Sequence, residues 1–448
     1  MPTIYVLWLT VTRWNGVPAS MSHPIELVPR DAAFANVIAA LPPLPPITLP
    51  PPPNGMRWTG SAKAIDPSET MYGKWDIEAR PNLQCTIAFL KTPAVSNMLN
   101  ALIALPHGEY EGRTIQASTV RTVARLLATR ARYRAEEKDD LCGAFDDLIG
   151  LLRISQNVMR MESGILVLTG SSCESMALHE LARLALERPL TREFAQAQIK
   201  QINATGGASP SLFELITEAT TSEVIAALDN CYSIDMNGNG WLVLSHQTGV
   251  LSSVPTNSGV RLGAWNLLSP LFNDRRTVIS KVEFIRREML RAGEMSFSKG
   301  TTYIHDLERS NPLNHLDGPA WMNTPLSNGA YILTLSSGRT AIYAAAATVI
   351  ATSAYQAETQ RLPASIDHLV PEYLSAVPID PFDGHSLRMQ ARAKSPGFIL
   401  YSVGPNQRDD AGMPASEVIS GTRQGDQIYD FMRTDALYFE PKLEKVSK

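Results

Sequence analysis

Helical periodicity through the middle of the chain constrains the fold more than any other feature. From about Thr92 to Ala292, apolar residues recur in steps of three and four, as at Val120, Val123 and Leu127. This spacing is typical of helices that bury one face. It predicts antiparallel helices with short loops, in a bundle or an irregular array. No fixed repeat period runs through the region, so a solenoid of identical repeats is not expected.

Capping and breaking residues place the ends of these helices. Asp140 is suited to cap the helix that begins at Leu141. Pro189 ends the helix expected over 175–187. A break is expected near Thr220-Thr221. The expected helices cover 141–152, 175–187, 191–202, 209–228 and 278–291. Residues 293–338 carry scattered Asn, Pro, Ser and Gly, and are expected to form a looser linker.

A proline-rich stretch runs from Leu41 to Pro53. Because proline fixes φ and lacks an N–H donor, helix and central strand are excluded there. A semi-rigid polyproline spacer is expected, and the alternative is a docking peptide for an aromatic groove.

Neither apolar run in the chain has the character of a membrane span. Residues 4–12 are far fewer than the roughly 20 that a span needs, and they lack the basic region of a secretory signal. The run 340–357 is rich in Ala and Thr, which favours a packed helix. No span is expected within this sequence, and an anchor upstream of Met1 stays open.

Charge and cysteine content argue against several classes of protein. The 448 residues carry a net charge of −4 and only 7% aromatics. Nucleic-acid binding needs a positive surplus and stacking side chains, so we expect no such partner. The chain has four cysteines: Cys85, Cys142, Cys173 and Cys231. They form no CxxC pair, and no His lies at zinc-ligand spacing from them. We expect small buried side chains rather than zinc ligands or disulfides.

The C-terminal fifth of the chain contains five blocks in a fixed order. After an expected helix over 339–358 come Leu-Pro-x-Ser and Leu-Val-Pro at 362–371, Val-Pro-x-Asp-Pro-Phe-Asp-Gly at 377–384, Leu-Tyr-Ser-Val-Gly-Pro-Asn at 400–406, and Gly-Asp-Gln-Ile at 425–428. Ser365 can cap a short helix. Residues 386–390 and 397–403 are expected to pair as a hairpin joined through 394–397.

In order and spacing these blocks resemble the soluble head of the type II secretion major pseudopilin, over about Arg339 to Thr434. The resemblance implies a long helix packed on a small antiparallel sheet, and a role in protein contacts. The family's helix normally continues from a hydrophobic stem with a prepilin cleavage site. A helical region stands there instead, so a filament subunit is not expected. The layout also looks like that of uncharacterised envelope proteins of planctomycete-type bacteria.

The resemblance also implies one Ca²⁺ in the loop after the last long strand. Calcium takes six to eight oxygens. The donors that the sequence offers are the Val403 carbonyl and the side chains of Asn406, Asp409, Asp410, Ser416 and Asp426. The chain departs from the family at Asn406-Gln407, where Asp-Gly is usual, which removes a carboxylate and a turn glycine. The alternative is a solvated acidic loop without an ion.

Other motifs stop short of a site. Residues 235–240 match the first half of an EF-hand loop, but His246 stands where a bidentate Glu is required. Ser296 and Lys299 give the S-x-x-K motif of serine-lysine acylases, but no K-T-G segment accompanies it. The S-x-N at 155–157 precedes Ser296, contrary to the order in those enzymes. His305, Asp306, His315 and Asp317 form the one local His/Asp cluster, and surface polar residues are the simpler interpretation. The basic stretch from Arg121 to Arg134 is expected to be a solvated helix face.

Together these observations predict an α+β protein: an N-terminal segment with a proline-rich linker (1–60), a mainly helical domain (61–335), a pseudopilin-like α+β domain (336–435) and a tail (436–448). We expect no enzyme, but a periplasmic or otherwise extracytoplasmic envelope protein whose pseudopilin-like region makes contacts with unidentified protein partners. One alternative is an enzyme with a site near Glu294, Asp306 and Asp317. The other is a helical scaffold that binds a peptide or lipid.

Overall fold

The computed structural model divides the chain into two compact units. One, the smaller unit, comprises Met1–Arg30, Glu162–Gly164 and Ser211–Ser337, and the larger unit comprises Asp31–Met161, Ile165–Pro210 and Gly338–Lys448. The structure describes residues 17–18, 32–43, 56–59, 75, 81–106, 108, 115–161, 163–207, 210–234, 239–242, 273–310, 328–391, 397–412, 427–428 and 442–445. Helices dominate and the sheets are small and antiparallel, which confirms the α+β class.

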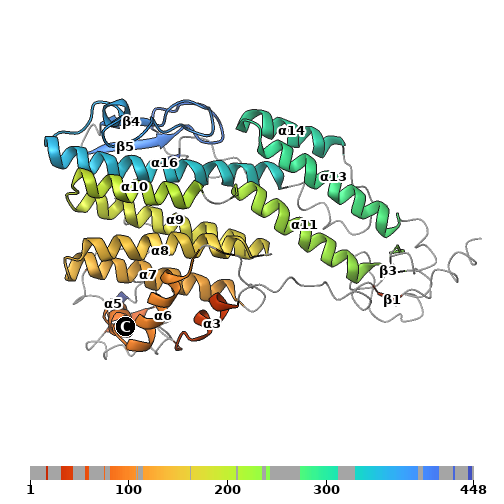
Figure 1. Cartoon of the computed structure of the whole chain (residues 1–448), viewed down its shortest axis with the longest axis horizontal. Helices are drawn as coiled ribbons and strands as arrows, with labels where there is room; N and C mark the ends of the chain where they lie inside the picture. Colours follow the sequence, from red (N-terminus) through yellow and green to blue (C-terminus); the bar gives the residue numbers. More distant parts are fainter. Residues whose placement is uncertain are drawn as a thin grey trace, which may run out of the picture. The chain divides into compact units, whose positions relative to one another are not determined.

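The larger unit is a stack of helices that ends in a short sheet (Figure 1). Its helices are α3 (Ala33–Ala39), α5 (Pro81–Leu90), α6 (Pro93–Ala104), α7 (Ala117–Glu137), α8 (Leu141–Met159), α9 (Gly164–Glu187), α10 (Arg192–Gly207) and most of α16 (Gly329–Thr359). α7 packs along α8, and α8 also contacts α6 and α10.

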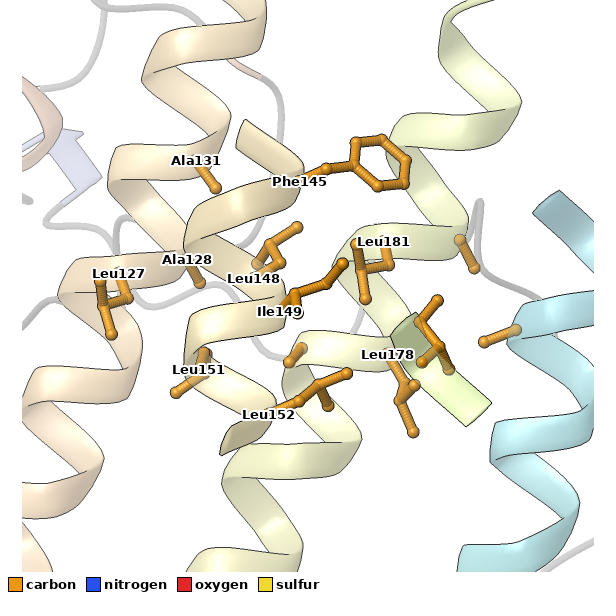
Figure 2. Packing of buried hydrophobic residues seen from close by; sticks show 14 of the residues in the cluster. Leu127, Ala128, Ala131, Phe145, Leu148, Ile149, Leu151, Leu152, Leu178 and Leu181 are labelled. Carbon is orange, nitrogen blue, oxygen red and sulfur yellow. The ribbon is translucent and has the colours of Figure 1, made fainter. Parts of the chain in front are cut away.

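The core of the larger unit is centred on α8. Figure 2 shows Leu148 and Leu152 of α8 among side chains of the neighbouring helices, with Leu127 on α7 and Leu181 on α9. All four side chains are fully buried. Burying one leucine completely contributes about 1.5–3 kcal/mol. The three- and four-residue spacing that predicts these helices thus also identifies their buried faces.

Side-chain caps set several helix starts. The Asp140 carboxylate accepts the Gly143 N–H at 2.9 Å, so the expected cap of α8 is confirmed. Ser211 caps α11 (Leu212–Cys231) through the Glu214 N–H at 3.1 Å. α11 runs through Thr220 and Thr221 without interruption, so the expected break is wrong. The Thr220 hydroxyl instead donates to the Ile216 carbonyl one turn back, at 2.7 Å.

The smaller unit contains α11, α13 (Arg275–Gly293), α14 (Phe297–Ser310) and the start of α16, with β1 (Val17–Pro18) paired to β3 (Ser233–Ile234). α13 packs against both α11 and α14. The linker expected over 293–338 is therefore wrong where the structure describes it. α14 forms because Phe297, Gly300 and Ile304 bury one face.

The sheet of the larger unit has the order β4-β5-β6. β4 (Arg388–Ala391) pairs antiparallel with β5 (Phe398–Ser402), which confirms the expected hairpin. β6 (Gln427–Ile428) pairs with the end of β5. A 3-10 turn, η5 (Ile366–Leu369), lies between α16 and the sheet in sequence. Separately, β2 (Met56–Thr59) pairs with β7 (Lys442–Lys445).

α16 is the layer that joins the sheet to the bundle, and in Figure 1 it lies between β4–β5 and α10. Its buried residues include Ala345, Ala346 and Ile350, which belong to the same core cluster as Leu400 of β5. Arg192 of α10 donates to Glu358 of α16 at 3.0 Å. The same guanidinium lies over the Tyr373 ring, 5.0 Å from its centroid. The C-terminal region, 336–435, therefore shares one core with the helices before it.

Candidate functional site

A buried aspartate organises the turn before the sheet. Asp380 has no exposed surface. Its Oδ1 accepts from the Phe382 N–H at 3.0 Å and the Ser402 hydroxyl at 2.9 Å. Its Oδ2 accepts from the Val403 N–H at 2.9 Å and from Arg388 at 3.1 Å. A buried carboxylate is tolerated when it is paired and hydrogen-bonded in this way. The Asp-Pro-Phe-Asp-Gly block thus fastens its turn to the end of β5.

Arg388, the first residue of β4, gathers three carboxylates. Besides Asp380, its Nη1 donates to Asp383 at 3.2 Å and to the Ser386 carbonyl at 3.0 Å, and its Nη2 pairs with Asp383. Its Nε lies 3.8 Å from Asp409 Oδ2. Partial burial raises the pKa of Asp383, but the hydrogen bonds from Arg388 and from the His385 N–H outweigh burial, so the pKa lies below its usual value.

The residues that follow β5, 403–412, form the loop in which the sequence predicts calcium; we call it the β5 loop. Asp409 Oδ1 accepts from the Tyr401 hydroxyl at 3.2 Å and the Ala411 N–H at 2.9 Å. Asn406 donates to Asp410 Oδ2 at 2.9 Å and accepts the Arg408 N–H at 3.1 Å. The loop's polar side chains are thus largely engaged with one another and with its backbone.

The structure brings four of the six predicted calcium donors into this loop: Val403, Asn406, Asp409 and Asp410. Ser416 and Asp426 lie outside the described residues. Calcium takes six to eight oxygens, and a carboxylate can supply one or two of them. Within the ranges that the structure describes, no group of three or more His, Cys, Asp or Glu is placed to hold a metal. The described residues of the loop carry part of the predicted donor set, and calcium binding there stays a prediction.

Two residues of the β5 loop other than glycine adopt a left-handed backbone conformation. Gln407 has φ +56° and Ala411 has φ +58°. A side chain in that region costs roughly 1–2 kcal/mol. Gln407 therefore carries backbone strain that a glycine at the same position would not.

A second polar cluster, which the sequence did not reveal, lies inside the helices of the larger unit. Arg339 of α16 forms a two-pronged pair with Glu174 of α9, at 2.5 and 2.9 Å. Tyr343 also donates to Glu174. Gln156 of α8 donates to the Thr205 carbonyl of α10 at 2.6 Å. Burial raises the pKa of Tyr343, and the Glu174 carboxylate raises it further. The only sequence signal was a glutamate within an apolar helical stripe.

This second cluster ties four helices together: α8, α9, α10 and α16. Glu174 and Gln156 have no exposed surface. A buried ion pair of this kind fixes which helix faces meet, because either charge without its partner would be strongly unfavourable.

The basic stretch of α7 does not behave as a solvated face throughout. Arg130 and Arg132 are buried, which corrects the expectation for these two residues. Arg130 forms two hydrogen bonds to Asp147 of α8, at 2.9 and 2.6 Å. A third bond joins it to the Asn100 side chain on α6 at 3.0 Å. The acidic partner of Arg130 thus lies on the next helix rather than in the solvent.

The constellations that suggested chemistry are not assembled among the described residues. Ser296 and Lys299 are both exposed. Asp306 pairs with Arg309 at 2.9 Å, and His305 lies 3.1 Å from Glu308. Glu294 is exposed, and His315 and Asp317 fall outside the description, as does most of the EF-hand-like hexamer. Its described residue Asn239 accepts the Arg276 N–H at 3.1 Å and so supports the start of α13.

The cysteines are free thiols that differ in their exposure to solvent. Cys173 and Cys231 are buried, as expected, whereas Cys142 is exposed on α8. Burial raises the pKa of the Cys173 thiol to about 12. Such a thiol is a weak nucleophile at neutral pH.

One open groove of about 520 Å³ lies at the start of the proline-rich stretch. It is lined by Ala35, Ile38, Ala39, Leu41, Pro42, Pro43, Ile115, Gln116, Ser118, Thr119 and Thr122. Apart from Leu41–Pro43, none of the residues singled out from the sequence contributes to it.

Helix length and hydropathy were also compared with those of membrane spans. Among the described residues, no single helix qualifies. Leu83–Leu90 and Pro93–Ala104 meet the criterion only as a pair bent by 75°.

The fold and site define a mainly helical α+β protein with an aspartate- and arginine-organised turn beside a short sheet. Comparison with protein-family models, with curated proteins and with solved structures gave no match.

Proposed function

We propose that this protein is a non-enzymatic, extracytoplasmic protein of the cell envelope that makes protein contacts through its pseudopilin-like region. The observation that carries the proposal is the succession after α16: a 3-10 turn, an aspartate-centred turn, and the β4-β5-β6 sheet. This is the order of elements that the sequence resemblance implies. Two of its sequence blocks, at 377–384 and 400–406, contain residues that fasten the turn to the sheet, such as Asp380 and Ser402.

The contact role is favoured over catalysis because the charged side chains near the sheet and inside the helices are paired with one another. Asp380, Arg388 and Glu174 are engaged in internal pairs and are mostly buried. Ile379, by contrast, is 53% exposed on the aspartate-centred turn. An exposed aliphatic side chain on a rigid turn is suited to contact another protein surface.

Calcium in the β5 loop remains part of the proposal. It would use Val403, Asn406, Asp409 and Asp410 together with Ser416 and Asp426. Calorimetric titration of the full chain with Ca²⁺ tests it, with Asp409→Ala and Asp426→Ala as variants. We expect saturable binding that either variant abolishes. Absence of heat at millimolar Ca²⁺ would remove the ion from the proposal and leave the contact role to be judged separately.

Location and contact can be tested together in the native cells. We would replace Ile379 with a photo-reactive residue, irradiate intact cells, and fractionate them. The expected result is an envelope-associated chain with a discrete cross-linked species. A control with the probe at exposed Tyr331, outside the pseudopilin-like region, should not give that species. A chain found only with cytoplasmic proteins would refute the envelope role, and equal cross-linking at both positions would refute the contact role.

A further inference from the structure

The positively charged side chain of Arg388 lies beside the β5 loop. Arg388 Nε lies 3.8 Å from Asp409 Oδ2, and Asp409 is one of the four described calcium donors. The two residues are far apart in sequence. They meet because the hairpin register places Arg388 opposite Tyr401, shortly before the β5 loop begins.

The guanidinium is not free to move away from this position. Its Nη1 and Nη2 are held by Asp380 and Asp383, and Nη1 also reaches the Ser386 carbonyl. Asp380 itself is fixed by Ser402 and the Val403 N–H at the end of β5. An arginine side chain stays protonated under all ordinary conditions. Arg388 therefore presents a permanent, fixed charge to the loop.

Tyr401 of β5 holds the other oxygen of Asp409. Its hydroxyl donates to Asp409 Oδ1 at 3.2 Å and accepts a hydrogen bond from Gln390 of β4 at 2.6 Å. Arg388 and Gln390 lie two apart, so both project from one face of β4. The β4–β5 hairpin thus contacts both oxygens of Asp409, one through the charge of Arg388 and one through the Tyr401 hydrogen bond.

We propose that Arg388 is the resident cation of the β5 loop, partly offsetting the negative charge of Asp409 in the calcium-free protein and weakening calcium binding at that carboxylate. The statement about calcium binding rests on the calcium part of the proposed function. The statement about the charge of Asp409 does not. A fixed positive charge beside a carboxylate lowers the gain from bringing a divalent cation to it.

The first half is tested without calcium, on the full chain in excess chelator at low salt, where screening is weak. Melting temperatures would be measured for Arg388→Gln, Asp409→Asn and the double variant. We expect the double variant to lose less than the sum of the single losses, because the second change removes a partner already gone. Strictly additive losses would overturn the proposal. Arg388→Gln also removes the positive partner of the buried Asp380 and can prevent folding. A second double-mutant cycle therefore uses Arg388→Lys, which keeps the positive charge but loses the paired hydrogen bonds of the guanidinium.

The second half is tested by calcium calorimetry of the same proteins. We expect Arg388→Gln to bind Ca²⁺ about tenfold more tightly than the wild-type chain, a change of about 1.4 kcal/mol. Arg361→Gln, the same charge change at an exposed arginine in the turn after α16, is the matched control and should leave the affinity unchanged. Equal affinities in Arg388→Gln and wild type would overturn the proposal. If no protein binds Ca²⁺, the calcium part of the proposed function fails, and the chelator cycle alone decides the role of Arg388.

Discussion

At the scale of single residues, burial and partner decide what each charge does. Arg130 and Arg309 are both arginines on helices with an aspartate within hydrogen-bonding distance. The Arg130 pair is almost wholly removed from water, whereas the Arg309 pair is exposed on both sides. Loss of one partner leaves a buried charge with weaker compensation in the first case and a hydrated charge in the second. The same kind of ion pair therefore has very different consequences for stability.

Arg130→Met is expected to destabilise the larger unit strongly. It removes the buried guanidinium that pairs with Asp147 and leaves that carboxylate with the partly exposed Arg134 at 3.2 Å, so we expect a loss of about 3 kcal/mol, the lower end of the range for breaking a buried pair. Urea unfolding followed by circular dichroism measures the loss. The double variant Arg130→Met/Asp147→Leu should recover much of it, and Arg309→Met should change the free energy of unfolding by less than about 1 kcal/mol. Similar losses in Arg130→Met and Arg309→Met would contradict the buried-pair argument.

Gln407→Gly is expected to stabilise the protein. The exposed Gln407 side chain stands at φ +56°, a conformation that glycine adopts without steric cost. Relief of that strain, less the greater entropy of glycine in the unfolded chain, should raise the free energy of unfolding by up to about 1 kcal/mol. Thermal unfolding measures the gain. Gln407→Ala, which keeps a Cβ in the same conformation, should bring no comparable increase, and a gain in both variants would count against backbone strain as the cause.

At the scale of elements, close approach between helices limits which residues fit. Gly150 of α8 lies against α6, and a Cβ at this position would meet the Ile103 side chain at 2.5 and 2.7 Å. Gly164 begins α9 and has ordinary space, with the nearest atom at 3.5 Å. Helix propensity treats both glycines alike and favours alanine at each. The packing of α6 on α8 thus reverses the local preference at one site only.

Gly150→Ala is therefore expected to destabilise the fold despite the better helix former. Overpacking costs about 1–3 kcal/mol and outweighs a propensity gain of about 1 kcal/mol. Gly164→Ala is the matched control and should be neutral or slightly stabilising. Chemical denaturation of both variants provides the comparison. If Gly150→Ala proved as stable as wild type, α6 and α8 could not approach as closely as described.

At the scale of the whole molecule, α16 after Gly338 and the β4-β5-β6 sheet belong to the same compact unit as the helices before residue 210. The compact units divide the chain near residues 210 and 337, and the larger unit takes in helices from before 210 as well as the sheet. α16 is buried along most of its length after Gly338. Its contacts to α9 and α10 include Ser353 with the Ala185 carbonyl and Glu358 with Arg192. These contacts stabilise the helix from the side opposite its sheet.

Residues 336–435 expressed alone are consequently expected to lack a cooperative tertiary fold. Removal of α9 and α10 would expose the Ala-rich face of α16, including Ala345 and Ala346, to water. Near-ultraviolet circular dichroism and amide NMR dispersion should show little fixed packing compared with the full chain. Addition of a chain covering residues 31–210 should restore dispersion. A well-dispersed spectrum from the isolated fragment would mean that the region is an independent domain.

The sequence by itself determined the helical class, the cap at Asp140 and the β4–β5 hairpin, because these depend on local spacing and on side chains that bond to nearby backbone. It also brought four calcium-donor candidates to one loop, since they are neighbours in the chain. Only the tertiary structure decided that Arg130 is buried, that Glu174 meets Arg339, and that Arg388 faces Asp409. Each of these depends on a partner from a distant segment, which packing and strand register bring into place. For the same reason α14 was missed: its buried face is narrow, and burial against its neighbours rather than local preference stabilises it.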